Sequence, residues 1–180
     1  MVCVLLANGF EEIEALTQVD YLRRAGIETV TAGVEGMTVE GGHGIKVLAD
    51  VPLAAIEKEK LEMVVVPGGL GGVKGVSESE TACDLVRYAY ENAILAAICA
   101  APSLTAKLGC VEGRKSTVYP GMDEAITANG GTYEDQAVVC DGNLITGRSA
   151  GAAEEFAFAL ITALRGKDAA EKVRHGIVAR

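Results

Sequence analysis

Short apolar runs alternate along this chain with longer segments that mix apolar and polar residues. Three runs, at 2–7, 63–66 and 94–98, are apolar at every position, which is typical of strands buried on both faces of a sheet. A fourth strand is predicted at 27–32, directly after the first helix. Three longer segments are predicted helices, at 11–25, 79–91 and 152–164. Strands that alternate with helices along the whole length predict a doubly wound α/β domain with a mostly parallel sheet and helices on both faces.

The remaining segments predict shorter elements. A turn at Asp141-Gly142-Asn143 joins two strands, 136–140 and 144–146, into a hairpin. A short strand is expected at 45–49, and short helices at 53–59, 102–108 and 168–174. The glycine-rich stretch 33–44 is predicted to be irregular, and 114–131 to hold a short strand, a turn at Tyr119-Pro120-Gly121 and a short helix. In a sheet of this kind, sites form beyond the carboxyl ends of the strands.

Composition narrows the class of protein. The 180 residues predict a single domain, 1–180, and the 49% of apolar residues are enough for a sizeable core. The net charge of −9 and the lack of a basic run argue against binding to nucleic acid or to an anionic membrane. The first apolar run lacks a basic start and ends in acids, so we interpret it as a strand and not a signal peptide. Five cysteines without a C-x-x-C pair argue against disulfides and structural zinc, and favour a cytoplasmic location.

Cys99 is the strongest candidate for chemistry. The segment ILAAICAAPS at 94–103 runs from a buried strand directly into the start of a helix. A thiol at such a turn faces a helix N-terminus, which can stabilise a thiolate. Hydrolases of the G-x-S-x-G type expose their serine in the same way, and here Ala97 and Ala101 replace the two glycines. The other four cysteines are expected to be ordinary apolar residues.

Other polar candidates have simpler explanations. Glu11 and Glu12 lie in the first turn of a predicted helix, where acids compensate the helix dipole. For Glu14, one turn in, the same explanation is favoured over a carboxyl that points towards the crevice and shares a hydrogen bond or a proton with Cys99. The Gly-rich run at 68–72 fails the dinucleotide fingerprint and is interpreted as a flexible turn, or as backbone amides that approach a substrate. His43 and His175 are expected at the surface, and a Cys–His–Asp triad requires the fold to bring His43 close to Cys99. No set of metal ligands can be assembled from the spacing.

Three motifs together resemble the ThiJ/PfpI superfamily, and most closely its Parkinsonism-associated protein deglycase branch. They are EEIE at 11–14, VPGG at 66–69 and AICAAP at 97–102, and the similarity extends in order over the whole chain. The resemblance implies a flavodoxin-like fold and a homodimer, and the dicarbonyl chemistry considered below needs no metal or organic cofactor. It implies that Cys99 is the reactive, easily oxidised cysteine and that Glu14 is its partner carboxyl. Gly68 and Gly69 with Ala100 would form an oxyanion-type pocket.

Some positions depart from the family pattern. Protease-like members carry a histidine directly after the cysteine, and this chain has Ala100. In the deglycase branch a histidine often stands where this chain has Tyr119, and a phenol is a poor base at neutral pH. An arginine that meets the cysteine across the dimer in that branch aligns near His43.

Three functional hypotheses follow. The first is cofactor-free detoxification of reactive dicarbonyls, either methylglyoxal to lactate or removal of early glycation adducts, with Cys99 as nucleophile and Glu14 as general acid and base. The second is an oxidative-stress sensor or redox-regulated chaperone that works through a Cys99 sulfinate. The third is an amidase or peptidase, which Ala100 and the lack of a neighbouring histidine make the weakest.

Overall fold

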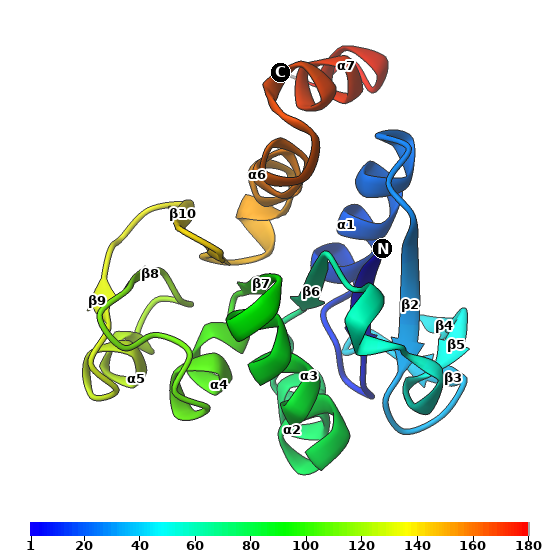
Figure 1. Ribbon diagram of the computed structural model, residues 1–180. Coiled ribbons are helices and arrows are strands. Elements are labelled where there is room, and N and C mark those ends of the chain that lie inside the picture. The colour runs from blue at the N-terminus through cyan, green and yellow to red at the C-terminus, as the bar shows by residue number, and fades with distance from the viewer. Residues whose placement is uncertain (180) are drawn as a thin grey trace.

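The centre of the molecule is a seven-stranded sheet with the order β10-β11-β7-β6-β1-β2-β5 (Figure 1). The computed structural model describes residues 1–179. The strands are β1 (Val2–Leu6), β2 (Thr29–Gly33), β5 (Val51–Pro52), β6 (Met63–Val66), β7 (Ile94–Ile98), β10 (Val138–Asp141) and β11 (Leu144–Gly147). Every neighbouring pair is parallel except the β10–β11 hairpin, which closes at the predicted turn. The mostly parallel α/β fold predicted from the apolar runs is confirmed.

Helices cover both faces of this sheet because successive residues of each strand point to opposite sides. In β1, Cys3 and Leu5 face one apolar cluster, while Val2, Val4 and Leu6 face the other. The first cluster packs against α2 (Leu70–Glu78), α3 (Glu80–Asn92), α4 (Ala101–Lys107) and α5 (Asp123–Thr127). The second packs against α1 (Glu12–Arg24), α6 (Ala153–Arg165) and α7 (Lys167–Gly176) (Figure 1). No helix among residues 1–179 is long and apolar enough to cross a membrane.

Smaller elements differ in part from the predictions. The strand expected at 45–49 is β4 (Lys46–Leu48), which forms a separate antiparallel pair with β3 (Thr38–Glu40) inside the supposedly irregular stretch. The helix expected at 53–59 is instead two 3₁₀ turns, η1 (Leu53–Ala55) and η2 (Lys58–Lys60), because Leu53 alone among these six residues is buried and little packing supports a longer helix. The 114–131 region holds the predicted short strand, β8 (Lys115–Ser116), and the predicted short helix, α5. β8 pairs with β9 (Thr132–Tyr133), which follows this region. A 3₁₀ turn, η3 (Ala150–Ala152), precedes α6.

The interpretation of residues 68–72 as a flexible turn is wrong from Leu70 onwards, because α2 begins there. Glycines disfavour a helix by about 1 kcal/mol each relative to alanine, so the local sequence hides this one. Packing compensates, since α2 lies too close to β1 and the following loop for side chains. A Cβ on Gly72 would lie 2.7 Å from the Cα of Phe10, and one on Gly75 would lie 2.8 Å from the Cβ of Ala7.

Candidate active site

Cys99 lies at a strained turn between β7 and α4. Its φ of +65° falls in the left-handed region, which residues other than glycine adopt at a cost. Backbone hydrogen bonds hold it there: its N–H donates to Gly147 O at 2.8 Å, and its own carbonyl accepts from the N–H of Tyr119 at 2.8 Å. Strain of this kind is kept where the surrounding structure requires it, and it often marks a functional position. The sharp turn predicted from the sequence is confirmed.

The carboxyl of Glu14 lies next to this thiol. Glu14 projects from the first turn of α1, is completely buried, and accepts a hydrogen bond at Oε2 from the N–H of Gly68 at 2.8 Å. Gly68 lies between the two groups: a Cβ there would lie 2.6 Å from the Cβ of Cys99 and would clash with Glu14 Oε2. Absence of a side chain at Gly68 therefore lets the carboxyl and the thiol approach each other.

The surroundings of Glu14 raise the pKa of its carboxyl towards neutral pH. Burial raises the pKa of this carboxyl to about 7, against the opposing effect of hydrogen bonds with Cys99 and the Gly68 amide, while the nearby charge of Glu11 raises it further. Oε1 has no hydrogen-bond partner of ordinary geometry among the described residues. A carboxyl with a pKa near 7 and a free lone pair can both accept and donate a proton under physiological conditions.

The surroundings of Cys99 oppose the thiolate form that a helix N-terminus can stabilise. Burial raises the pKa of Cys99 to about 12, and the adjacent Glu14 carboxylate adds to this rise. The backbone N–H groups of Ala100 and Gly69 hydrogen-bond the sulfur and act in the opposite direction. Because Glu14 disfavours the thiolate only when it is itself ionised, a proton on Glu14 removes that effect. The two groups therefore compete for one proton, and the thiolate is favoured when the carboxyl holds it.

A cavity of about 400 Å³ opens above the sulfur. It is lined by Glu11, Gly69, Leu70, Cys99, Ala100, Tyr119, Pro120 and Met122. Four of the six predicted site residues thus line it, while Gly68 and Glu14 lie next to Cys99 but do not line the cavity. Sequence reasoning missed Glu11, which was assigned to the helix dipole, and Leu70, because the glycines concealed α2. It also missed Pro120 and Met122, although both follow Tyr119 closely.

His43 does not join this cavity. Its side chain is largely exposed, as predicted, and its Nδ1 lies 2.9 Å from Glu12 Oε2 and 3.6 Å from Glu11 Oε2. His175 is also exposed. Neither histidine lines the Cys99 cavity, so a Cys–His–Asp triad is not formed within the described chain.

Glu12 has a role that the sequence did not predict. It is buried, and Oε1 accepts from the backbone N–H of His43 at 2.8 Å and of Ile45 at 3.5 Å. Glu11, Glu12 and His43 bring possible metal-ligand atoms within 4.8 Å of one another. Since both oxygens of Glu12 already hold the 43–45 loop, we assign it to loop anchoring and assign no metal to this cluster. Compensation of the helix dipole is therefore not its main role.

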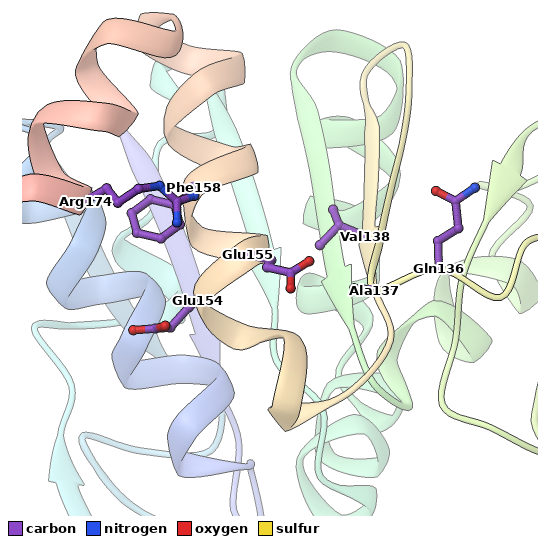
Figure 2. Close-up of a pocket in the computed structure, with 7 residues that line it drawn as sticks. All are labelled: Gln136, Ala137, Val138, Glu154, Glu155, Phe158 and Arg174. Carbon is purple, nitrogen blue, oxygen red and sulfur yellow. The ribbon is translucent and has the colours of Figure 1, made fainter. Parts of the chain in front are cut away.

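A second cavity, of about 590 Å³, lies between α6, α7 and the start of β10 (Figure 2). Figure 2 shows Glu154 and Glu155 projecting from α6, with Arg174 over the ring of Phe158 at 4.0 Å from its centre. None of its seven lining residues is a cysteine, serine or histidine. The Cys99 cavity is therefore the better candidate for covalent chemistry.

With this geometry established, comparison with known proteins identifies the family. The DJ-1/PfpI family model matches residues 1–163. The chain belongs to this family. It is 41% identical to the Drosophila melanogaster protein dj-1beta over 177 residues, covering 97% of this chain and 95% of that protein. It is also 32% identical over 148 residues to a Pyrococcus horikoshii protein named a deglycase, covering 82% and 89% of the two chains.

Solved structures agree with this assignment. The crystal structure of Drosophila DJ-1beta superimposes with a TM-score of 0.94 at 40% identity, covering 99% of this chain and 97% of that one. Oxidized Toxoplasma gondii DJ-1 gives a TM-score of 0.93 at 30% identity, again covering 99% and 97% of the two chains. The relatives of this chain thus include one protein named a deglycase and one structure described as oxidized.

Proposed function

We propose that this DJ-1/PfpI protein detoxifies small reactive dicarbonyls without a cofactor, converting methylglyoxal to lactate or removing early glycation adducts. The observation that carries the proposal is the buried Glu14 carboxyl, with its pKa of about 7, hydrogen-bonded to the thiol of Cys99 at the base of the cavity. Dicarbonyl conversion requires a nucleophile and a group that moves a proton between adjacent carbons, and this pair supplies both.

The reaction begins when the sulfur of Cys99 attacks the aldehyde carbon of methylglyoxal. The thiol proton passes to Glu14, which then delivers it to the carbonyl oxygen, so a hemithioacetal hydroxyl forms and Glu14 becomes a carboxylate again. The N–H groups of Gly69 and Ala100 are placed to stabilise the negative charge that develops on this oxygen. Tyr119 lines the same cavity and can donate a further hydrogen bond.

Glu14 then transfers a proton between the two adjacent carbons, so that one carbon is oxidised and the other is reduced within the same molecule. Its carboxylate removes the proton from the former aldehyde carbon and delivers it to the neighbouring carbonyl oxygen, which gives an enediol. Glu14 then takes the proton of the first hydroxyl and gives it to the neighbouring carbon as the thioester carbonyl forms. The first carbon is thereby oxidised to a thioester and the second is reduced to a carbinol. Water hydrolyses the thioester, releases lactate and restores the thiol, so one water is consumed and no external oxidant is needed.

Lactate formation from methylglyoxal without glutathione tests this mechanism. Wild type is expected to turn over, whereas Cys99→Ala and Glu14→Gln are expected to be inactive. Cys140→Ala removes the exposed cysteine and serves as a matched control that should keep full activity. Turnover that survives in Cys99→Ala would overturn the proposal.

A second candidate is an oxidant sensor or redox-regulated chaperone. Cys99 is partly exposed at a cavity, whereas Cys3 and Cys110 are buried, and a protonated Glu14 can donate a hydrogen bond to a Cys99 sulfinate. Mass spectrometry after graded peroxide treatment tests this role. Cys99 is expected to oxidise before Cys140, which is more exposed but has no carboxyl partner; the reverse order would eliminate the sensor.

We further propose that the protein acts as a homodimer in the cytoplasm. Three large apolar side chains, Ile13, Ile45 and Leu48, are 52–72% exposed on α1 and the β3–β4 region, and a second copy would cover them. The five free cysteines suit a reducing compartment. Sedimentation of wild type and Leu48→Glu should give a dimer and a monomer, respectively; a monomeric wild type would contradict this assembly.

A further inference from the structure

Three hydrogen bonds join Cys99 to two distant segments of the chain in a closed ring. The N–H of Cys99 donates to Gly147 O at 2.8 Å, and the carbonyl of Cys99 accepts from the N–H of Tyr119, also at 2.8 Å. Two residues before Tyr119, the N–H of Thr117 donates to Thr146 Oγ1 at 2.9 Å. Because Thr146 and Gly147 are adjacent in β11, the ring leaves Cys99 at its N–H and returns to it at its carbonyl.

Thr146 supplies the one side-chain atom in this ring. The other two hydrogen bonds join backbone atoms, so a change of side chain leaves their donors and acceptors in place. Thr146, Ser116 and Thr117 are completely buried, and Thr146 Oγ1 also accepts from Ser116 Oγ at 3.4 Å. Thr117 Oγ1 donates to Gln136 O at 3.0 Å, but that bond ties the segment to the chain before β10 and not to β11. The Thr146 hydroxyl is therefore the link of the ring that a single substitution can remove.

The Thr146 hydroxyl lies in apolar surroundings. Side chains alternate across a strand, so Thr146 points to the same face of the sheet as Leu144, which belongs to an apolar cluster. Its partner in the neighbouring strand is Ala97, another member of that cluster. A buried hydroxyl in such surroundings is costly unless it is hydrogen-bonded. The bond with the Thr117 N–H meets this requirement and also fixes the segment that carries Tyr119.

The ring bears on the reactive turn because the conformation of Cys99 is strained. A φ of +65° is unfavourable for a residue with a side chain, so the neighbouring structure must impose it. The bonds with Gly147 and Tyr119 hold the N–H and the carbonyl of the same residue. Tyr119 can hold that carbonyl only while its own segment stays in place, and the bond between Thr117 and Thr146 ties that segment to β11.

We infer that Thr146 is a positioning residue, whose buried hydroxyl holds Cys99 in its strained turn and thereby keeps the sulfur beside Glu14. Without this hydroxyl, the 117–119 segment shifts and the Cys99 carbonyl loses the N–H of Tyr119. The turn then relaxes towards negative φ, and the sulfur moves away from the carboxyl. The effect on turnover rests on the proposed function, whereas the effect on the thiol does not.

Alkylation of Cys99 by iodoacetamide tests this inference without turnover. The sulfur displaces iodide and forms a thioether, peptide mass spectrometry gives the rate at Cys99, and exposed Cys140 supplies the internal reference. In wild type, Cys99 and Glu14 compete for one proton, so the rate should rise with pH up to about 7 and then reach a plateau. A thiol that has moved away from Glu14 titrates alone, so its rate should continue to rise by about tenfold per pH unit above pH 7 until its own pKa is reached.

Thr146→Val keeps the shape of the side chain but removes the hydroxyl, and it should abolish the plateau. Thr146→Ser keeps the hydroxyl and should keep the plateau. Thr29→Val is the matched control, because Thr29 is a buried threonine of β2 whose Oγ1 donates to Ile27 O at 3.0 Å, outside the ring. A plateau that persists in Thr146→Val would overturn the inference, and so would a plateau that is also lost in Thr29→Val.

Hydrogen exchange of the wild-type protein gives a test that does not depend on the folding of a variant. If the ring opens as a unit, the amides of Cys99, Thr117 and Tyr119 should share one opening free energy, so their protection factors should agree within about threefold. Nuclear magnetic resonance measures the three amides separately. A wider spread would show that the three bonds open independently, which contradicts the ring.

Turnover separates this inference from the proposed function. With methylglyoxal, Thr146→Val should lower kcat by at least about tenfold and change KM by less than about threefold, because the reacting pair is misplaced after the substrate has bound. If wild type converts methylglyoxal and Thr146→Val keeps both kcat and the plateau, the inference fails and the proposed function stands. If wild type converts nothing while the plateau still depends on Thr146, the proposed function fails and the positioning role stands.

Discussion

Glu12 and Glu14 lie two residues apart on α1 and are both buried, yet their surroundings shift the pKa values of the two carboxyls in opposite directions. Burial alone would raise the pKa of Glu12, but hydrogen bonds from the His43 ring and from backbone amides outweigh it and lower that pKa. Glu14 accepts from one backbone amide and contacts a thiol, and its pKa rises to about 7. The number of donors around a buried carboxyl thus decides whether it anchors structure or moves protons.

The largest expected effect is the loss of kcat/KM when Glu14, and not Glu12, is replaced. Glu14→Gln should lower kcat/KM for methylglyoxal by about a thousandfold, because it removes the group that moves the proton. Glu12→Gln leaves the Cys99 cavity intact, so its effect should be smaller by a factor of at least about ten. Steady-state kinetics of the two variants decide the comparison, and equal losses would contradict it.

The stability of the same variants should change with pH. The rise of the Glu14 pKa from 4.5 to about 7 means that its ionisation costs the folded state at most about 3 kcal/mol. This group's contribution to stability is fully present below pH 4.5 and is lost as the pH rises through about 7.

Glu14→Gln removes this cost, so it should raise the free energy of unfolding by up to about 3 kcal/mol at alkaline pH and by little at acidic pH. Glu12 has the opposite sign, since its pKa is lowered, and Glu12→Gln should destabilise the protein at neutral and alkaline pH. Urea unfolding over a pH series measures both effects. A gain for Glu14→Gln that does not depend on pH would show that charge is not the cause.

Two glycines make room for these carboxyls and allow a matched test. A Cβ on Gly68 would disturb both Glu14 and Cys99, while a Cβ on Gly41 would lie 2.7 Å from Glu12 Cγ. Gly68→Ala should lower kcat/KM by about a hundredfold because it displaces the reacting pair. Gly41→Ala should lower Tm while it costs far less activity, and the reverse pattern would contradict the assignment.

The smallest expected effect is the pH dependence of the rate. Below about pH 7 both Glu14 and Cys99 are protonated, so kcat/KM for methylglyoxal should fall by about tenfold per pH unit and should level off above it. Glu12→Gln should keep this acid limb, since Glu12 does not share the proton. An acid limb near pH 4.5 in wild type would show that Glu14 does not titrate as its surroundings indicate.

Much of the fold could be predicted because its signals are local. Uninterrupted apolar runs identified β1, β6 and β7, and the strand-to-helix transition at Cys99 placed the nucleophile beyond the carboxyl end of a central strand. The helix α2 could not be found in this way, since Gly71, Gly72 and Gly75 oppose a helix locally. Glycines occupy these positions because α2 packs closely against residues 7–10, which lie more than 60 positions earlier in the chain.

The sequence by itself determined a mostly parallel α/β fold, a cysteine at a strained turn and acids at the start of α1, because each depends on residues adjacent in the chain. Only the tertiary structure decided which acid takes part in the chemistry. The partners of Glu12 come from residues 43–45, and those of Glu14 from Gly68 and Cys99. Burial and hydrogen-bond donors set a pKa, and both arise from segments that meet only when the chain has folded.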